Sequence, residues 1–466
     1  MTSDLFHLSV AAAGEMLRTR KFSPVELVDA FLARTEHVDA RIKSYLLVSA
    51  EKARASAKEA EAAIMVGKWR GPLHGIPYGV KDTFYTKGLR TCANSRLLID
   101  FVPDHDAAII ERLDAAGAIL LGKLNTWEYG TGLGLVYHDA PFAHSTNPWK
   151  ENYFTGGSST GSGAAVAAST AMFALGADTG GSIRAPAAGC GIIGLKPTYG
   201  RVSRHGILPN CWSLDVAGPM TWTVEDCALV LQAIAGFDLR DPACADVPVA
   251  DYVRRLDEGV RGMTIGIVRD VGHSVPIDAA NLAGIEDVAS VLAAAGAHLV
   301  PLALPGSPSV YRAATTLISG CERASAHERD FIDHGDKMGR ELRESIMAGL
   351  AARAVDYLAA QRRRRDLAEA LDAAVIGFDA IISPCTLHTA PPASDADKVK
   401  AFMTDTMTTA FNISGHPALS IRTGFDAEGL PTSAQIVGRH FDEATLLRVG
   451  HTYERARCWH ERRPAL

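Results

Sequence analysis

Residues 156–186 read GGSSTGSGAAVAASTAMFALGADTGGSIRAP, so two loops rich in Gly and Ser enclose a stretch of small apolar residues. Consecutive glycines let the backbone N–H groups of a loop converge on one point, because no Cβ hinders a close approach. Converging N–H donors are what the stabilisation of a tetrahedral oxyanion requires. Ser182 follows two glycines and lies close to Arg184, which makes it a candidate nucleophile with an oxyanion hole beside it.

Two other functions of the first loop are disfavoured by its residues. A nucleotide phosphate loop requires Lys after its last Gly, whereas Ser162 follows Gly161 here. A nucleophile elbow of the form G-x-S-x-G would place Ser159 at its centre, but it needs an apolar strand directly before it. Residues 148–154 are polar and typical of a loop. Plain turns around a packed helix remain the alternative for each loop taken alone.

The rest of the chain predicts an α/β fold, because helical patterns alternate with short apolar runs. We expect helical structure over residues 8–66, 107–116, 164–175, 285–295 and 341–375, with Ser23 as an N-cap ahead of Pro24. We expect strands over residues 118–122, 263–268, 380–384 and 417–421, and loops over 156–163 and 176–186.

Composition excludes several classes of function. Lys and Arg number 47 against 53 Asp and Glu, so a net charge of −6 gives no footprint for nucleic acid or an anionic membrane. The N-terminus does not resemble a secretory signal, and the longest apolar stretch, residues 163–175, is too short for a membrane span. Eight cysteines without a C-x-x-C pair, and histidines without metal spacing, predict no metal and no cofactor. We expect a soluble, cytoplasmic protein.

The motif at 156–186 resembles the defining motif of the amidase signature family. Ser158 and Ser182 are 24 positions apart, as the two catalytic serines of that family are. Further similar segments are GIPYGVKD (75–82), GKLN (122–125), TNPW (146–149), GLKPT (194–198), SLD (213–215), GLP (429–431) and QIVG (435–438). One departure is Thr160, where the family has Gly or Ser; we expect altered packing of the loop with the chemistry intact.

The resemblance implies a Ser-Ser-Lys triad of Lys81, Ser158 and Ser182. Ser182 would attack the carbonyl carbon, Ser158 would pass the proton, and Lys81 would act first as base and then as acid. It also implies a cis peptide bond between Gly157 and Ser158. The backbone N–H groups of the oxyanion hole would come from Thr179, Gly180, Gly181 and Ser182.

Two further expectations concern charged residues near the triad. Asp178 and Arg184 would hold the second loop rather than take part in the chemistry. An ordinary Lys, with a pKa near 10.4, is a poor base at neutral pH, so Lys81 must be buried. The alternative is an ion pair between Lys81 and Asp82 on the surface.

The substrate is less well defined by the sequence. The resemblance implies an acyl side lined by Thr126, Trp127, Tyr129 and Gly130. Trp127 and Trp212 would favour an aryl or bulky apolar acyl group, although either could be a plain core residue.

Two functions remain open. The favoured one is a free-standing hydrolase of a small-molecule amide, such as an aryl amide, an anilide or a carbamate, acting as a monomer or homodimer. The alternative is the glutaminase (A) subunit of a tRNA-dependent amidotransferase. Residues 317–365, where that subunit recognises glutamine, offer only a possible match at residues 361–364.

The resemblance also sets the domain organisation. It implies one catalytic domain over residues 1–466, with a twisted mixed β-sheet and helices on both faces. Within it we expect an N-terminal helical segment (1–66), a core (67–236), a more variable region (about 237–372) and a C-terminal part of sheet and helices (373–466).

Overall fold

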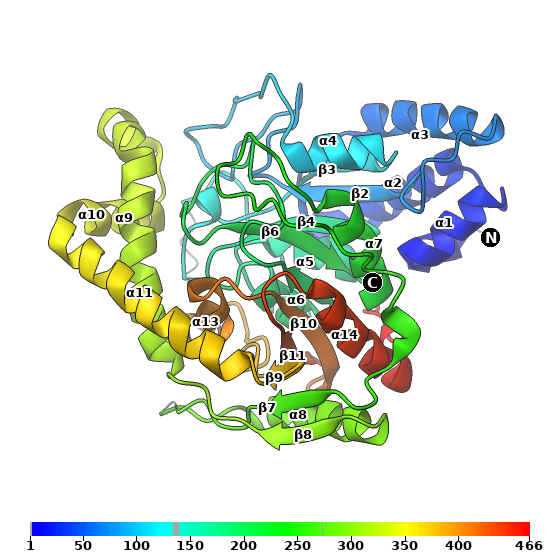
Figure 1. Ribbon diagram of the computed structural model, residues 1–466. Coiled ribbons are helices and arrows are strands. Elements are labelled where there is room, and N and C mark those ends of the chain that lie inside the picture. Colours follow the sequence, from blue (N-terminus) through cyan, green and yellow to red (C-terminus); the bar gives the residue numbers. More distant parts are fainter. Residues whose placement is uncertain (1, 134–138, 273) are drawn as a thin grey trace.

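A mixed β-sheet runs through the computed structural model, which describes residues 2–133, 139–272 and 274–466 (Figure 1). Its strands are β1 (Tyr45–Val48), β2 (Pro77–Lys81), β3 (Ile119–Leu124), β4 (Phe173–Asp178), β5 (Ile193–Lys196), β6 (Val216–Thr221), β7 (Thr264–Ile267), β8 (His298–Pro301), β9 (Ala380–Ser383), β10 (Ala418–Phe425) and β11 (Pro431–Val437). Over the described residues they lie in the order β1-β3-β2-β4-β6-β5-β10-β11-β9-β7-β8.

The direction of pairing changes along the sheet. β2 pairs in parallel with β3 and β4, and β7 pairs in parallel with β8 and β9. The remaining neighbours are antiparallel. The sheet therefore has an antiparallel centre between two parallel groups, and all four predicted segments of the chain contribute strands to it.

The helices are α1 (Val10–Arg18), α2 (Pro24–Ile42), α3 (Ala50–Met65), α4 (Ala108–Ala115), α5 (Thr160–Ala167), α6 (Arg184–Cys190), α7 (Val224–Ile234), α8 (Ala279–Ala294), α9 (Pro308–His334), α10 (Arg340–Ala351), α11 (Ala354–Val375), α12 (Ala396–Thr404), α13 (Thr408–Ile413) and α14 (Glu443–Arg457). Short 3₁₀ helices cover Thr2–His7, Glu128–Gly130, Leu256–Glu258, Gly335–Lys337 and Trp459–Glu461. Among these described helices, none has the length and apolarity needed to span a membrane.

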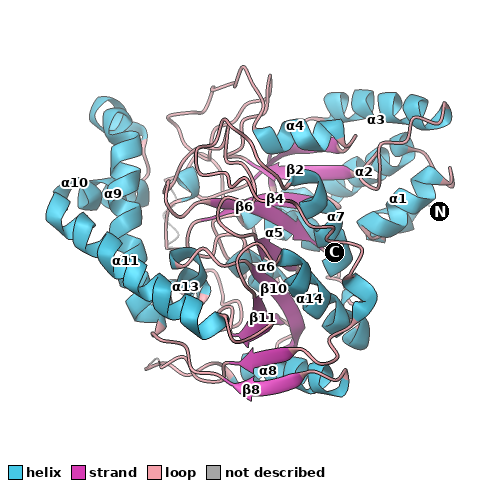
Figure 2. Ribbon diagram, in the orientation of Figure 1, coloured by secondary structure: helices cyan, strands magenta, loops and turns pink. Residues whose placement is uncertain are grey.

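Alternating side chains divide the core between the two faces of the sheet, because neighbouring residues of a strand point to opposite sides. Phe173 and Leu175 of β4 belong to the large core cluster that includes side chains of α7, α8 and α14. Ala174, between them, packs instead with side chains of α5 and α6. Figure 2 shows helices on both sides of the strands. The structure thus confirms the expected α/β fold with a mixed sheet flanked by helices.

Two predicted elements are wrong in detail. Residues 8–66 are not helical throughout, because β1 pairs with β3 at one edge of the sheet. The predicted helix over 164–175 is two elements: α5 starts earlier, at Thr160, and β4 begins at Phe173. A short run of small apolar residues fits a buried strand as well as a helix, and pairing with β2 and β6 decides for the strand.

The capping prediction is confirmed. The Ser23 side chain accepts a hydrogen bond from the Glu26 N–H, and Glu26 accepts one from the Ser23 N–H in return. This capping box fixes the start of α2 at Pro24.

Helices α9, α10 and α11 form a helical arm, which Figure 1 shows together on one side of the molecule in yellow-green and yellow. The arm belongs to the region that the sequence left least defined. Its inner side contacts the loop of residues 207–215 through Arg323, His327 and Arg364.

Candidate active site

Lys81 is the last residue of β2, and its side chain is buried with 2% exposure. Its Nζ donates a hydrogen bond of 2.8 Å to the Oγ of Ser158. The alternative of a surface ion pair with Asp82 is wrong, because Asp82 is itself buried and its carboxylate lies 3.4 Å from Lys123 Nζ.

Burial lowers the pKa of Lys81 to about 7, although the nearby carboxylates of Asp215 and Asp178 act in the opposite direction. Near neutral pH a large share of Lys81 is therefore unprotonated and able to accept a proton. An ordinary Lys would be almost fully protonated at that pH.

The backbone around Ser158 is set by close packing. The peptide bond between Gly157 and Ser158 is cis, as the resemblance implies. A Cβ on Gly157 would lie 2.1 Å from the Trp127 ring, so only Gly fits there. Trp127 also donates its backbone N–H to the Ser158 carbonyl oxygen at 3.2 Å. Thr160 is buried as the first residue of α5, and its hydroxyl has no hydrogen-bond partner among the described residues.

Asp178 and Arg184 lie at the two ends of the second loop and are both completely buried. The Asp178 carboxylate accepts hydrogen bonds from the N–H groups of Gly181, at 2.7 Å, and Ile183, at 3.1 Å, as well as from the Arg184 guanidinium. Burial alone would raise the pKa of Asp178, but the Arg184 charge lowers it below its ordinary value. The carboxylate is therefore ionised and ties the loop together.

The loop presents free backbone donors next to Ser182. Of the four N–H groups predicted for the oxyanion hole, that of Gly181 is occupied by Asp178. The N–H groups of Thr179, Gly180 and Ser182 have no partner within the described ranges. The Ser182 side chain is partly exposed, and its hydroxyl likewise makes no hydrogen bond to the described residues. The Ser158–Ser182 link of the predicted relay is therefore open in this conformation.

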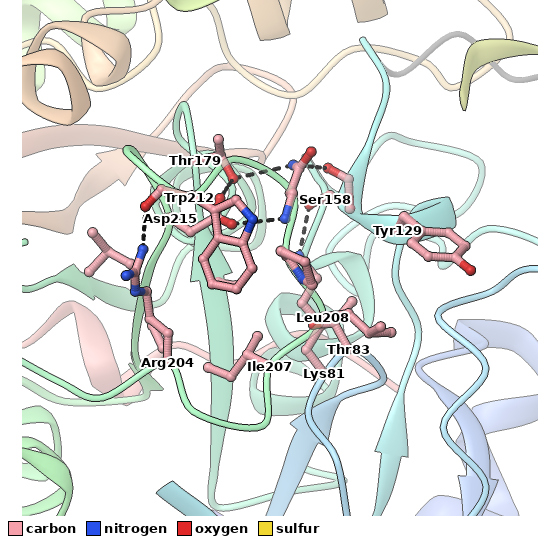
Figure 3. Close-up of a pocket in the computed structure, with 16 residues that line it drawn as sticks. Lys81, Thr83, Tyr129, Ser158, Thr179, Arg204, Ile207, Leu208, Trp212 and Asp215 are labelled. Carbon is pink, nitrogen blue, oxygen red and sulfur yellow. Dashed lines mark hydrogen bonds between the residues drawn. The ribbon is translucent and has the colours of Figure 1, made fainter. Parts of the chain in front are cut away.

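A pocket opens at the Lys81–Ser158 pair (Figure 3). The space between its lining atoms is about 470 Å³, including the part open to solvent. Its lining includes three residues predicted for the substrate site, Tyr129, Gly130 and Trp212. Other lining residues are Thr83, Ser158, Thr179, Arg204, Ile207, Leu208, Pro209, Asn210 and Asp215. One wall is apolar, and the Trp212 ring on it is 53% exposed.

Thr126 and Trp127 do not line this pocket, and their role in substrate binding stays a prediction. The Trp127 ring packs in a separate core cluster and stacks on Phe154, with ring centroids 6.2 Å apart. Thr126 is buried, and its hydroxyl donates to the Trp127 carbonyl oxygen. Trp127 therefore supports the backbone of Gly157 from behind, which corresponds to the core alternative.

A polar network behind the pocket wall was not expected from the sequence. The Asn210 amide donates to the Gly130 carbonyl oxygen at 3.1 Å and to the Thr179 hydroxyl at 3.2 Å. Its Oδ1 accepts a 2.8 Å hydrogen bond from the buried guanidinium of Arg323 on α9. Asn210 and Arg323 are 113 positions apart, and no local pattern in the sequence links them.

Comparison with known proteins shows the family of the chain. The Amidase family model matches residues 26–447, and the chain belongs to this family. The chain is 40% identical to the A subunit of the glutamyl-tRNA(Gln) amidotransferase of Chloroflexus aggregans, over an alignment covering 100% of this chain and 99% of that protein.

Solved structures show the same fold. The peptide amidase of Stenotrophomonas maltophilia superposes with a TM-score of 0.85 at 32% identity, covering 98% of each chain. A bacterial aryl acylamidase of the amidase signature family superposes with a TM-score of 0.89 at 26% identity, covering 97% of each chain. The protein is an amidohydrolase of the amidase signature class, an enzyme that acts on carbon–nitrogen bonds.

Proposed function

We propose that the chain cleaves an amide through an acyl-enzyme on Ser182. The observation that carries this proposal is the buried contact between Lys81 Nζ and Ser158 Oγ, at 2.8 Å, with the pKa of Lys81 lowered by burial to about 7. A lysine with a pKa near 7 that is hydrogen-bonded to a serine hydroxyl can take up a proton near neutral pH.

The reaction follows from these positions. Ser182 Oγ attacks the carbonyl carbon while its proton passes to Ser158 Oγ, and the proton of Ser158 passes to Lys81. The free N–H groups of Thr179, Gly180 and Ser182 receive the charge that develops on the carbonyl oxygen. Collapse breaks the C–N bond, and the amine leaves with a proton returned from Lys81 through Ser158. Water then attacks the ester carbonyl carbon, and the same groups carry its proton to Lys81. Collapse of this second intermediate breaks the bond between the acyl carbon and Ser182 Oγ, the proton returns through Ser158 to Ser182, and the carboxylic acid leaves.

For the substrate, the glutaminase function is now the first candidate. The sequence alone favoured the free-standing hydrolase, but three similar curated relatives are A subunits of glutamyl-tRNA(Gln) amidotransferases and align along their whole length, at 38 to 40% identity. In this function Ser182 would release ammonia from glutamine, and the ammonia would be used by partner subunits.

The free-standing amidase is the second candidate, and the pocket wall favours it. Ile207, Leu208, Pro209 and the half-exposed ring of Trp212 form an apolar surface beside Ser158. Such a wall suits an aryl or alkyl acyl group better than the charged groups of an amino acid. The peptide amidase and aryl acylamidase neighbours support this candidate.

One assay separates the two candidates. The purified chain is incubated with glutamine, simple primary amides, anilides and carbamates, first alone and then with the other subunits of a glutamyl-tRNA(Gln) amidotransferase, and released ammonia or amine is measured. Turnover of glutamine that depends on the added subunits supports the first candidate. Turnover of anilides by the chain alone supports the second.

The matched control is Ser182→Ala, which should keep the fold and lose turnover of every substrate. Retained turnover in this variant would remove Ser182 as the nucleophile, whichever substrate is used.

Three expectations from the sequence remain predictions. They are the single catalytic domain over residues 1–466, the monomer or homodimer, and the cytoplasmic location. The location agrees with either candidate.

A further inference from the structure

Three side chains from separate parts of the chain meet away from the pocket. Asp372 lies in the last turn of α11, His416 lies between α13 and β10, and His440 follows β11. One oxygen of Asp372, Oδ1, lies 3.2 Å from His416 Nε2 and 3.3 Å from His440 Nε2. The candidate ligand atoms of the three residues all lie within 4.8 Å of one another.

The surroundings of the cluster both fix it and leave it accessible. His416 is buried with 2% side-chain exposure, whereas Asp372 and His440 are 51% and 38% exposed. His416 Nδ1 lies 2.8 Å from the Ser414 hydroxyl, which fixes the ring and directs Nε2 towards Asp372. The two imidazole rings are stacked, with centroids 4.1 Å and planes 28° apart. A buried, oriented ligand with an open outer side permits an ion and a water molecule to enter.

The spacing matches that of a zinc site. Zinc binds His nitrogen and carboxylate oxygen at about 2.0–2.1 Å in tetrahedral geometry, which places neighbouring ligand atoms about 3.3–3.4 Å apart. The two distances from Asp372 Oδ1, 3.2 and 3.3 Å, agree with such edges. We propose that Asp372, His416 and His440 bind Zn²⁺, with water as the fourth ligand. No metal was expected from the sequence, because no two of these residues have a metal-binding spacing along the chain.

A second His cluster lacks this capacity. Both ring nitrogens of His388 are taken by different carboxylates, Nδ1 by Asp278 at 3.1 Å and Nε2 by Asp405 at 3.2 Å. Those carboxylates lie on opposite sides of the ring, so they do not converge on one ion together with it. His388 therefore offers a matched control.

Bound zinc would join the helical arm to the sheet. Asp372 comes from α11 of the arm, whereas His416 and His440 directly precede and follow the β10–β11 hairpin. The same helix carries Arg364, which donates to the Ser213 carbonyl oxygen in the loop that contributes to the pocket wall. The metal would thus hold the arm in the position from which it supports that loop.

Zinc binding to the full-length chain, freed of metal by a chelator, tests the proposal. Titration against a chromophoric chelator should give one Zn²⁺ per chain. Asp372→Asn keeps an oxygen that can accept both N–H groups but replaces the carboxylate ligand, so its affinity should fall about 100-fold or more. The zinc affinity of His440→Ala should fall by a similar factor. The affinity of His388→Gln should equal that of the wild type.

The readout does not depend on turnover, so it stands or falls separately from the amidase proposal. Circular dichroism of Asp372→Asn checks that its fold is retained. With Co²⁺ in place of Zn²⁺, the wild type should show the intense visible absorption of a tetrahedral site. No stoichiometric binding at micromolar zinc, or equal affinity in the wild type and Asp372→Asn, would overturn the proposal and leave a hydrogen-bonded cluster only.

Discussion

Replacing Lys81 with Met should abolish amide hydrolysis and, near neutral pH, make the protein more stable. Burial lowers the pKa of Lys81 from 10.5 in an ordinary environment to about 7 in the folded chain. Each unit of pKa difference corresponds to about 1.4 kcal/mol between the two protonation states. Burying Lys81 therefore costs the folded state about 4 kcal/mol at pH 7. Met has a side chain of similar length and carries no charge.

A second effect works against the gain. Lys81→Met removes the donor to Ser158 Oγ, and an unsatisfied buried hydroxyl costs about 1–3 kcal/mol. We expect the variant to be about 1–3 kcal/mol more stable than the wild type at pH 7. The loss at Ser158 does not depend on pH, whereas the cost at Lys81 does.

The pH dependence separates the two effects. Between pH 7 and 10.5 the unfolded chain holds the proton on Lys81 and the folded chain does not, so folding releases a proton. The free energy of unfolding of the wild type therefore rises with pH in that window and is lowest below pH 7. The advantage of the variant should shrink by about 1.4 kcal/mol per pH unit there. Lys196, whose pKa burial also lowers to about 7, is present in both proteins and cancels in the difference.

The assay is urea unfolding of both proteins at pH 7, 8, 9 and 10, followed by tryptophan fluorescence. Lys58→Met, a change at an exposed lysine of α3, serves as the control and should show no such slope. A difference in unfolding free energy between the wild type and Lys81→Met that stays constant over these pH values would refute the reasoning.

Three more outcomes are expected. The kcat/KM of the wild type should rise about tenfold per pH unit below pH 7 and level off above it, because unprotonated Lys81 is the active form; a profile that rises only near pH 10 would contradict this. Arg184→Met should lower the free energy of unfolding by about 3–5 kcal/mol, since it leaves Asp178 buried without its cation; chemical denaturation measures this, and a loss below about 1 kcal/mol would argue against the pairing. Asn210→Leu should raise KM more than it lowers kcat. The double variant with Arg323→Met should lose less free energy of unfolding than the sum of the two single variants, by about 0.5–3 kcal/mol. Strict additivity would mean that the two residues are not coupled.

Local sequence was enough to predict the parts of the site that depend on backbone shape. The glycines at 156–157 and 180–181 predicted tight loops, and the structure shows why one of them is needed: a Cβ on Gly157 would collide with the Trp127 ring. The cis bond before Ser158 was expected only from the family resemblance, and the burial of Lys81 from its need to act as a base. These features follow from residues that are near neighbours in the chain or in one motif.

Predictions failed where an element is decided by its partners in space. The apolar run before Asp178 fits a helix until β2 and β6 take it up as a central strand. Trp127 has the large aromatic side chain that often lines a pocket, but its ring packs in the core against Phe154 and close to Gly157. Pairing and enclosure of this kind involve distant segments, and single-sequence patterns carry no record of them.

The strength of the base in this site depends on how the neighbouring carboxylates are occupied. Asp215 and Asp178 both act to raise the pKa of Lys81, yet no carboxylate of the described residues lies within 4.0 Å of its Nζ. Asp178 is taken up by Arg184 and by the N–H groups of its own loop, and Asp215 accepts from the Thr179 hydroxyl at 2.5 Å. The Lys81 shift itself has burial as its largest cause, which outweighs the two carboxylates and keeps the pKa near 7. The loop that presents the oxyanion donors therefore also sets the strength of the base, and a change in one alters the other.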